Sequence, residues 1–374
     1  MADRPAIPAL TSVRGLAACW VAVYHYRLEL PAGTPAAVMD VAALGYLAVD
    51  FFFQLSGFII AYNYFWKLRD GGTGVADFIV ARVARIWPLH IVTLFLVLLN
   101  PIAILLFSEA RQLGERYDPA LFLLNIPLVQ NWGFTTALSW NIPAWSISAE
   151  LGAYLLFPAL VLLAGLAWRR LGRPGVAALL AGTHLAFMMT WDWLGVGIGG
   201  DIPRYGLARC VFQFAMGALL FLVWDGMAAA WRRRLDGAAL ALVAVGVVAL
   251  ALGAPDHLVA TWLFAALIWL GLTAAANGRG LLAHPWALWL GEVSFAIYMI
   301  HYFVRDWVKF LFLGPQHGPL WAFGIYAAAT LAAAALLHRL VELPARRGIQ
   351  SLWRARRAAS RRAPPTPLPG ADAR

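Results

Sequence analysis

The chain has 374 residues, of which 62% are hydrophobic and 13% are charged, and its formal net charge at pH 7 is +10. Soluble domains are typically about half apolar and about one quarter charged, so this composition excludes a soluble protein and indicates a polytopic α-helical membrane protein. The positive charge does not indicate nucleic-acid binding, because the arginines stand in short loops between apolar runs. Cys19 and Cys210 lie inside apolar runs, so neither a disulfide nor a metal site is expected.

Ten apolar stretches are long enough to cross a bilayer, for which a helix needs about 20 residues. In chain order they are residues 9–29, 42–66, 87–108, 143–167, 175–196, 206–224, 238–254, 257–276, 291–313 and 320–342. The first stretch carries Arg14, and we interpret it as a retained span rather than a cleavable signal peptide. Residues 119–140 are also apolar, but Asn, Gln and Pro interrupt them, which leaves their path ambiguous.

The distribution of basic residues orients the spans. With a cytoplasmic N-terminus, the inner loops contain Lys67, Arg69, Arg82, Arg85, Arg169, Arg170, Arg173, Arg232, Arg233, Arg234 and Arg279. The outer segments contain fewer, chiefly Arg27, Arg111, Arg116 and Arg204. This positive-inside pattern holds only if residues 119–140 do not cross, so we predict that they form an interfacial or re-entrant segment on the outer side. Both termini are then cytoplasmic.

Two regions follow from this organisation. Residues 1–345 are expected to form one transmembrane domain, and residues 346–374 a basic, Pro-rich cytoplasmic tail. The first part of the tail predicts a surface helix on anionic membrane lipids, and the Pro-rich end predicts disorder. No appended soluble domain and no internal repeat are expected.

Arg14 and His25 are ionisable residues within the first span. They are 11 residues apart, which on a helix amounts to about three turns plus 20°, so both lie on one face and are separated by roughly 16 Å. Charged groups in spans are costly and usually mark function. The alternative is structural: Arg14 extends to the interface, and His25 pairs with a neighbouring helix.

The second span and the segment before the third carry further candidates. Asp50 lies mid-membrane, where it either orients His25 or pairs with an arginine. Arg82 and Arg85 are three residues apart and point the same way, an arrangement of guanidinium groups that suits phosphate groups. Ordinary positive-inside bias is the alternative explanation for these two arginines.

The fourth and ninth spans each carry a polar stripe. Glu150 and Tyr154 share one face at the start of the fourth span, close to Trp140 and Trp145, as in a polar-substrate site, although aromatic residues also anchor helices at the interface. The ninth span aligns three more polar residues on one face, namely Tyr298, His301 and Arg305. A structural histidine is the alternative there. Near the end of the tenth span, His338 and Glu342 are expected to form a structural pair.

Six ordered segments together resemble the membrane-bound acyltransferase family 3, which contains O-antigen and exopolysaccharide O-acetyltransferases. They are "IPALTSVRGLAACWVAVYHY", "FFFQLSGFII", "ARVARIWPLH", "PAWSISAELGAYLLFP", "GEVSFAIYMIH" and "VELPAR", spread over most of the chain. The resemblance implies a ten-helix core, acyl-CoA as donor and a hydroxyl acceptor reached from the opposite side. Many relatives carry an additional esterase-like domain, and none is expected here.

The resemblance gives the polar residues expected roles in transmembrane O-acetylation of a polysaccharide or glycolipid at the bacterial inner membrane. His25 is the expected general base, and Asp50 or Glu150 the carboxylate that sets its tautomer. Arg14, Arg82 and Arg85 are expected to bind the phosphates of acyl-CoA, in the simplest case acetyl-CoA. The expected acceptor contacts are Trp140, Trp145, Tyr154, Tyr298, His301 and Arg305.

The sequence leaves several points open. Direct general-base catalysis by His25 and an acyl-histidine intermediate are both compatible with these residues. A transporter or flippase for a lipid-linked sugar or organic anion is the competing class, because buried ionisable residues also serve ion-coupled transport. A glycan polymerase or ligase predicts a large outer loop, whereas the loops here are short.

Overall fold

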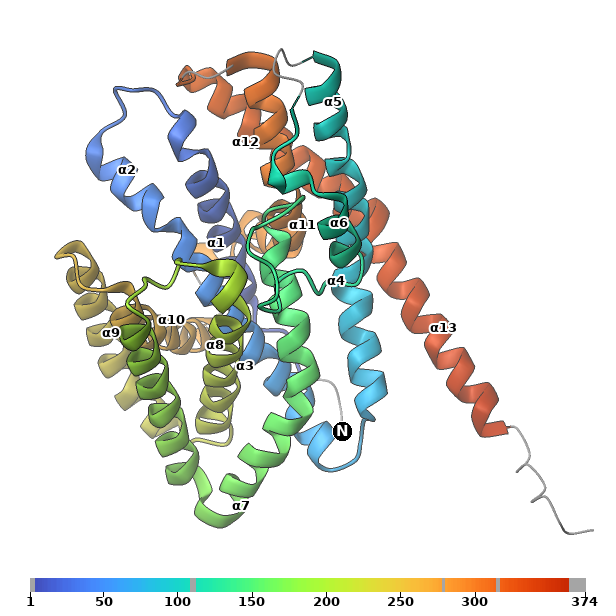
Figure 1. The fold of residues 1–374 in the computed structure, drawn as a ribbon. Helices are drawn as coiled ribbons and strands as arrows, with labels where there is room; N and C mark the ends of the chain where they lie inside the picture. The colour runs from blue at the N-terminus through green and yellow to red at the C-terminus, as the bar shows by residue number, and fades with distance from the viewer. Residues whose placement is uncertain (1–3, 108–111, 278–279, 314–316, 363–374) are drawn as a thin grey trace, which may run out of the picture.

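A computed structural model describes residues 4–107, 112–277, 280–313 and 317–362 (Figure 1). Within these ranges the chain forms helices joined by loops and contains no strand. Eight of the described helices are long and apolar enough to cross a membrane. The predicted class, an all-α polytopic membrane protein, is therefore confirmed.

The main helices follow one another along the chain. They are α1 (Pro8–Tyr26), α2 (Ala36–Ala43), α3 (Ala48–Arg69), α4 (Val75–Val97), α5 (Leu99–Phe107), α6 (Pro119–Asn125), α7 (Ala144–Leu194), α8 (Ile202–Trp224), α9 (Ala229–Ala251), α10 (Asp256–Asn277), α11 (Pro285–Val308), α12 (Leu320–Leu337) and α13 (Leu343–Arg362). Single-turn 3₁₀ segments lie at Arg27–Glu29, Leu44–Leu47, Glu115–Tyr117 and Leu281–Ala283, and π-helical turns at Lys309–Leu313 and His338–Glu342. Each of the ten predicted stretches overlaps one or more of these helices, and α7 contains two of them, but α1 is not among the eight helices that meet the length and composition of a span.

Helix α7 consists of two helical arms joined at a sharp bend at Gly172. This residue has φ +63° and ψ −156°, a backbone conformation that side chains disfavour and glycine tolerates. Figure 1 shows the two arms of α7 running in opposite directions from a bend at the lower end of the molecule. The bend separates the predicted spans 143–167 and 175–196.

Glycines bring two pairs of helices into close contact. A Cβ atom added at Gly291 of α11 would collide with the backbone of Thr11 on α1. In the same way, Gly57 of α3 and Gly217 of α8 each leave room only for the backbone of the other helix. Small residues allow such close approach between helices in membranes. The α1–α11 pair matters most for function, because the polar residues on both helices face each other.

Residues 119–140 do not form a spanning helix. Only α6 is helical, and Trp140 ends a stretch of turns that leads into α7. Polar groups of this segment are paired with neighbouring helices. Nε2 of His90 donates to the Asn125 backbone carbonyl at 2.7 Å, and the backbone N–H of Asn131 donates to the Ser148 hydroxyl at 3.1 Å. Irregular backbone within a membrane protein is tolerated when other protein groups satisfy its polar atoms. The position of this segment relative to the bilayer stays a prediction, as does the cytoplasmic side of the termini.

Helix α13 continues α12 through a π-helical turn and packs beside α4. Trp353 donates its indole N–H to Asp77 at 2.8 Å, and Arg357 forms an ion pair with the same carboxylate. The predicted basic helix at the start of the tail therefore exists, and its contact with lipid stays a prediction. The Pro-rich end, predicted to be disordered, lies outside the described residues.

Candidate functional site

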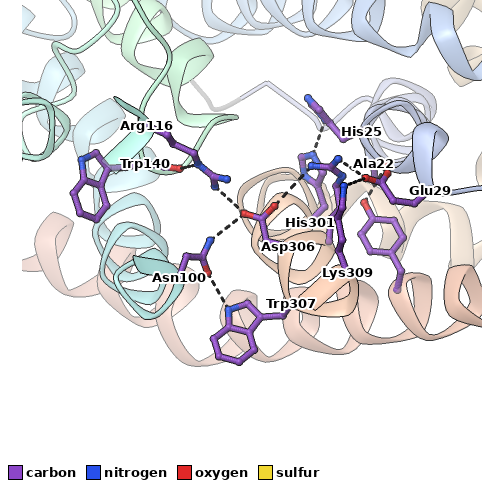
Figure 2. Close-up of polar contacts among 12 residues, drawn as sticks. Ala22, His25, Glu29, Asn100, Arg116, Trp140, His301, Asp306, Trp307 and Lys309 are labelled. Carbon is purple, nitrogen blue, oxygen red and sulfur yellow. Dashed lines mark hydrogen bonds and ion pairs between the residues drawn. The ribbon is translucent and has the colours of Figure 1, made fainter. Parts of the chain in front are cut away.

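His25 and His301 meet between α1 and α11. Nε2 of His301 lies 3.0 Å from Nδ1 of His25 (Figure 2), and Nδ1 of His301 lies 3.2 Å from the Ile297 carbonyl oxygen. A carbonyl oxygen only accepts, so Nδ1 of His301 donates and, in the neutral ring, its Nε2 accepts from His25. His25 therefore carries its proton on Nδ1, and its Nε2 keeps a free lone pair.

The expected carboxylate beside His25 is not present at this contact. Asp50 instead binds Arg209, with Nε and one terminal nitrogen of the guanidinium 2.7 and 2.5 Å from the two carboxylate oxygens. Both side chains are almost completely buried, and Gln213 adds a contact of 3.4 Å. Two-point pairing with a guanidinium occupies both oxygens. Of the two expectations for Asp50, pairing with an arginine is the one that the structure shows.

Glu150 also lies away from His25. Its carboxylate accepts a hydrogen bond from the Ser56 hydroxyl, and the Tyr154 hydroxyl lies 3.5 Å from that of Ser56. Glu150 lines a cavity together with Arg14, whereas His25 lines a different one. Glu150 and Tyr154 face the cavity that contains Arg14 and not the one that contains His25. The geometry therefore does not support the prediction that Glu150 orients His25.

The cavity around Glu150, here called the arginine cavity, has a volume of about 160 Å³. The charged and hydroxyl-bearing side chains that line it are Arg14, Ser56, Arg82, Arg85, Ser146, Glu150, Tyr154, Ser294 and Tyr298. Arg14 donates to Ser294 at 2.9 Å and to the Gly291 carbonyl at 2.6 Å, both on α11. All three arginines of the predicted donor site therefore meet in one place.

The three arginines differ in their charge partners. Arg85 forms an ion pair with Glu342, which also lies 3.1 Å from His338, as the sequence predicted for that pair. Arg82 contacts the Tyr64 hydroxyl at 3.4 Å, and its buried Nε has no hydrogen-bond partner among the described residues. Neither Arg14 nor Arg82 forms an ion pair within the part of the chain that the structure describes. Arg14 and Arg82 thus outnumber Glu150, the carboxylate that also lines the cavity, and the excess of positive charge suits an anion.

The second cavity, here called the histidine cavity, has a volume of about 520 Å³. Its polar and aromatic lining residues are Tyr24, His25, Arg27, Tyr46, Trp145, Arg209, Asp256, Tyr298, Tyr302 and Arg305. Two residues, Val49 and Tyr298, line both cavities. Helix α1 therefore presents Arg14 to one cavity and His25 to its neighbour, and both residues contact α11. The predicted common face of α1 is confirmed.

Comparison with known proteins now adds to this geometry. A family model described as an acyltransferase domain, that of acyltransferase family 3, matches residues 7–339. The chain belongs to this acyltransferase family. It is 29% identical to "Acyltransferase MdmB" of Streptomyces mycarofaciens over 91% of this chain and 92% of that protein. It is 31% identical to "Protein 2 in picA locus" of Rhizobium radiobacter over 38% of this chain and 75% of that protein. No solved structure matches the chain.

The six predicted acceptor contacts of this acyltransferase take different positions relative to the two cavities. Trp145 and Arg305 line the histidine cavity, Tyr298 lines both cavities, and Tyr154 lines the arginine cavity. His301 stands behind His25 as its hydrogen-bond partner. Trp140 lines neither cavity.

The position of Trp140 corrects the expectation of an acceptor contact. Its buried indole donates to the Asp118 carbonyl at 2.9 Å and packs edge-on against Phe122. Its backbone N–H donates to the Arg116 carbonyl at 2.8 Å. The physical reason is that these contacts bury the indole against the chain that precedes α7, away from both cavities.

An ion-pair network surrounds the end of α11 that carries His301. Glu29 binds Arg305 at 2.5 Å and Lys309 at 3.2 Å, while Asp306 binds Arg116 at 2.9 Å (Figure 2). The sequence analysis did not predict these ion pairs, and it did not predict Arg209 as the partner of Asp50. The position of Arg209 inside the apolar stretch 206–224 could have indicated a buried partner. The partners of Arg305 come from other helices and have no local signature.

Proposed function

We propose that this acyltransferase transfers a short acyl group from acyl-CoA in the arginine cavity to a hydroxyl group of a carbohydrate in the histidine cavity. The observation that carries the proposal is that one helix, α1, presents a cation to the first cavity and an imidazole to the second. Acyl-CoA is strongly anionic and cytoplasmic, and the basic residues gather on the side predicted to be cytoplasmic. The acceptor is then reached from outside the bacterial inner membrane.

The donor side is suited to phosphate groups. Arg14 and Arg82 offer guanidinium donors without ion-pair partners among the described residues. A neighbouring cavity of about 250 Å³ beside Arg4 shares Arg14, Leu55 and Ile59 with the arginine cavity. These two adjoining spaces favour a ligand with a bulky nucleotide end and a thin arm. CoA has this shape.

The acceptor side is suited to a sugar ring. Tyr24, Tyr46, Trp145 and Tyr302 provide aromatic surface around the histidine cavity. Aromatic side chains combine apolar faces with polar edges, which matches the mixed surface of a carbohydrate. The larger volume of this cavity also fits an acceptor more bulky than the transferred group.

His25 performs the proton transfer in this proposal. Nε2 of His25 takes the proton of the acceptor hydroxyl while the hydroxyl oxygen bonds to the thioester carbonyl carbon. The carbon–sulfur bond then breaks, and the CoA thiolate takes the proton back from the imidazolium. In the alternative route Nε2 first attacks the thioester carbonyl carbon and the carbon–sulfur bond breaks, which gives an acyl-histidine and CoA thiolate. The acceptor hydroxyl oxygen then attacks the acyl carbon, the carbon–nitrogen bond breaks, and the hydroxyl proton goes to the thiolate. Both routes need the lone pair that the contact with His301 leaves on Nε2.

Acceptor-dependent release of thiol from acetyl-CoA tests the proposal. Membranes containing the protein are incubated with acetyl-CoA carrying a labelled acetyl group and with extracted cell-surface polysaccharide. We expect free CoA and labelled ester to form in equal amounts, both dependent on the polysaccharide. A carrier of lipid-linked sugars or organic anions would release no thiol, and that outcome would refute the proposed function.

Replacing His301 tests whether it positions His25. A His301→Leu variant removes the acceptor for the His25 Nδ1 proton, so we expect kcat to fall by at least about tenfold, because the wrong tautomer lacks the free Nε2. The KM for acetyl-CoA should change little, since His301 does not line the arginine cavity. Steady-state kinetics on purified protein separate the two parameters.

A His301→Gln variant is the matched control for this prediction. Its amide oxygen can accept from Nδ1 of His25, so it should recover part of the lost kcat. If His301→Gln and His301→Leu were equally impaired and KM rose in both, His301 would have a structural role only.

Replacing Arg82 tests the donor site. Arg82→Ala removes an unpaired cation from the arginine cavity, and we expect the KM for acetyl-CoA to rise by roughly tenfold or more, because a hydrogen bond between charged groups contributes about 1.5–3 kcal/mol. The control is Arg169→Ala, which removes an exposed arginine of α7. An unchanged KM in Arg82→Ala would remove Arg82 from the donor site.

A further inference from the structure

Tyr298 stands between the arginine cavity and the histidine cavity. Its side chain is 6% exposed and lines both spaces. The ring packs edge-on against Phe52, with centroids 5.8 Å apart, and its centroid lies 5.8 Å from that of His301. A group that moves from the Arg14 side to His25 along the shared lining passes between this ring and Val49, the other residue that lines both cavities.

A hydrogen bond holds the Tyr298 side chain in this position. The Ser146 hydroxyl lies 3.1 Å from the Pro143 carbonyl, to which it donates, and 2.7 Å from the Tyr298 hydroxyl. Since Ser146 has one proton, the Tyr298 hydroxyl donates to Ser146. The phenol is thus satisfied while buried, and the ring is fixed between α11 and α7.

The two cavities differ in size and lining. The arginine cavity has about 160 Å³ and the histidine cavity about 520 Å³. Beside the arginines, the smaller cavity is lined by apolar side chains, including Phe52, Phe53 and Leu55. Such a lining accepts an acyl chain, and its volume limits the length of that chain. Interiors are close-packed, so extra methylene groups have no free space unless a wall residue is smaller.

We propose that Tyr298, held by Ser146, sets the acyl-chain length that this enzyme accepts by forming the wall that narrows the opening between the arginine cavity and the histidine cavity, through which the acyl group reaches His25. The inference rests on the proposed function and specifies its donor: the substrate class is acyl-CoA with a short chain. Tyr298 and His301 are three residues apart on one face of α11. The wall and the partner of His25 therefore have a fixed relative position.

The dependence of kcat/KM on chain length tests this inference. Acetyl-, butanoyl-, hexanoyl- and octanoyl-CoA are compared with the same polysaccharide acceptor. For the natural protein we expect kcat/KM to fall steeply beyond the shortest chains. In Tyr298→Ala the cavities merge, and the ratio of hexanoyl to acetyl transfer should rise by at least about tenfold, the range that hydrophobic pockets give for one or a few methylene groups.

Three further variants keep the test specific. Tyr298→Phe retains the ring and should keep the preference for short chains. Tyr298→Leu removes the ring but fills more space than alanine, so its ratio of hexanoyl to acetyl transfer should lie between those of the natural protein and Tyr298→Ala. It also provides the test if Tyr298→Ala does not fold. Tyr326→Ala is the matched control, because Tyr326 is also buried and hydrogen-bonded, on α12, but lines neither cavity. Its chain-length profile should equal that of the natural protein.

The outcomes separate this inference from the proposed function. If the natural protein transfers acetyl groups but Tyr298→Ala and Tyr298→Leu keep its chain-length profile, the role of Tyr298 is wrong and the proposed function stands. Equal transfer of long and short chains by the natural protein would also overturn the inference. If no acyl-CoA supports transfer at all, the proposed function itself fails.

Discussion

Alanine in place of His25 is expected to abolish acyl transfer while leaving acyl-CoA binding intact. The change removes Nε2 of His25, the atom whose lone pair the contact with His301 leaves free to take the proton of the acceptor hydroxyl. General-base catalysis contributes typically about 10²- to 10⁴-fold to rate, so kcat should fall by at least that range. Labelled acetyl transfer measures kcat, and calorimetric titration with CoA measures binding.

A histidine elsewhere in the membrane region provides the control. His184 lies in the second arm of α7, where its Nδ1 is 2.9 Å from the Leu180 carbonyl, and it lines neither cavity. His184→Ala should transfer acetyl groups at a rate close to that of the natural protein. A folded His25→Ala protein with the natural rate would contradict both the base role and the acyl-histidine route.

Residues that act within one helix were predictable from the sequence. Arg14 and His25 lie on one face because helical geometry fixes their relation, and the structure shows both directed at α11. The same reasoning grouped Tyr298 with His301 and paired His338 with Glu342. Spans were also predictable, since apolar length is a local property of the chain.

Contacts between helices were not predictable in the same way. The sequence offered Asp50 and Glu150 as partners of His25, and the structure gives that place to His301. Asp50 pairs with Arg209, which is 159 positions away in the chain. No short sequence pattern predicts either pairing, because both depend on which helices pack together and in which register. Glycines at the helix contacts permit the close approach of the packed helices.

The buried pair of Asp50 and Arg209 leads to the second large expected effect. Asp50→Asn leaves a guanidinium buried without its counter-charge, and Arg209→Met leaves an unpaired carboxylate. Breaking a buried ion pair from one side typically costs about 3–5 kcal/mol of unfolding free energy. We expect each single variant to show a clearly lower Tm in detergent and a lower yield of folded protein.

The double variant Asp50→Leu with Arg209→Met distinguishes the charge from the packing. It removes both charges at once, so its Tm should exceed that of either single variant, since an apolar replacement of the whole pair avoids the cost of an unpaired charge. Arg69→Ala, which breaks the exposed contact with Asp70, is the matched control and should cost less than about 1 kcal/mol. If the double variant were as unstable as the sum of the single ones, the two residues would act independently. The pair would then not be what fixes α8 against α3 at the wall of the histidine cavity.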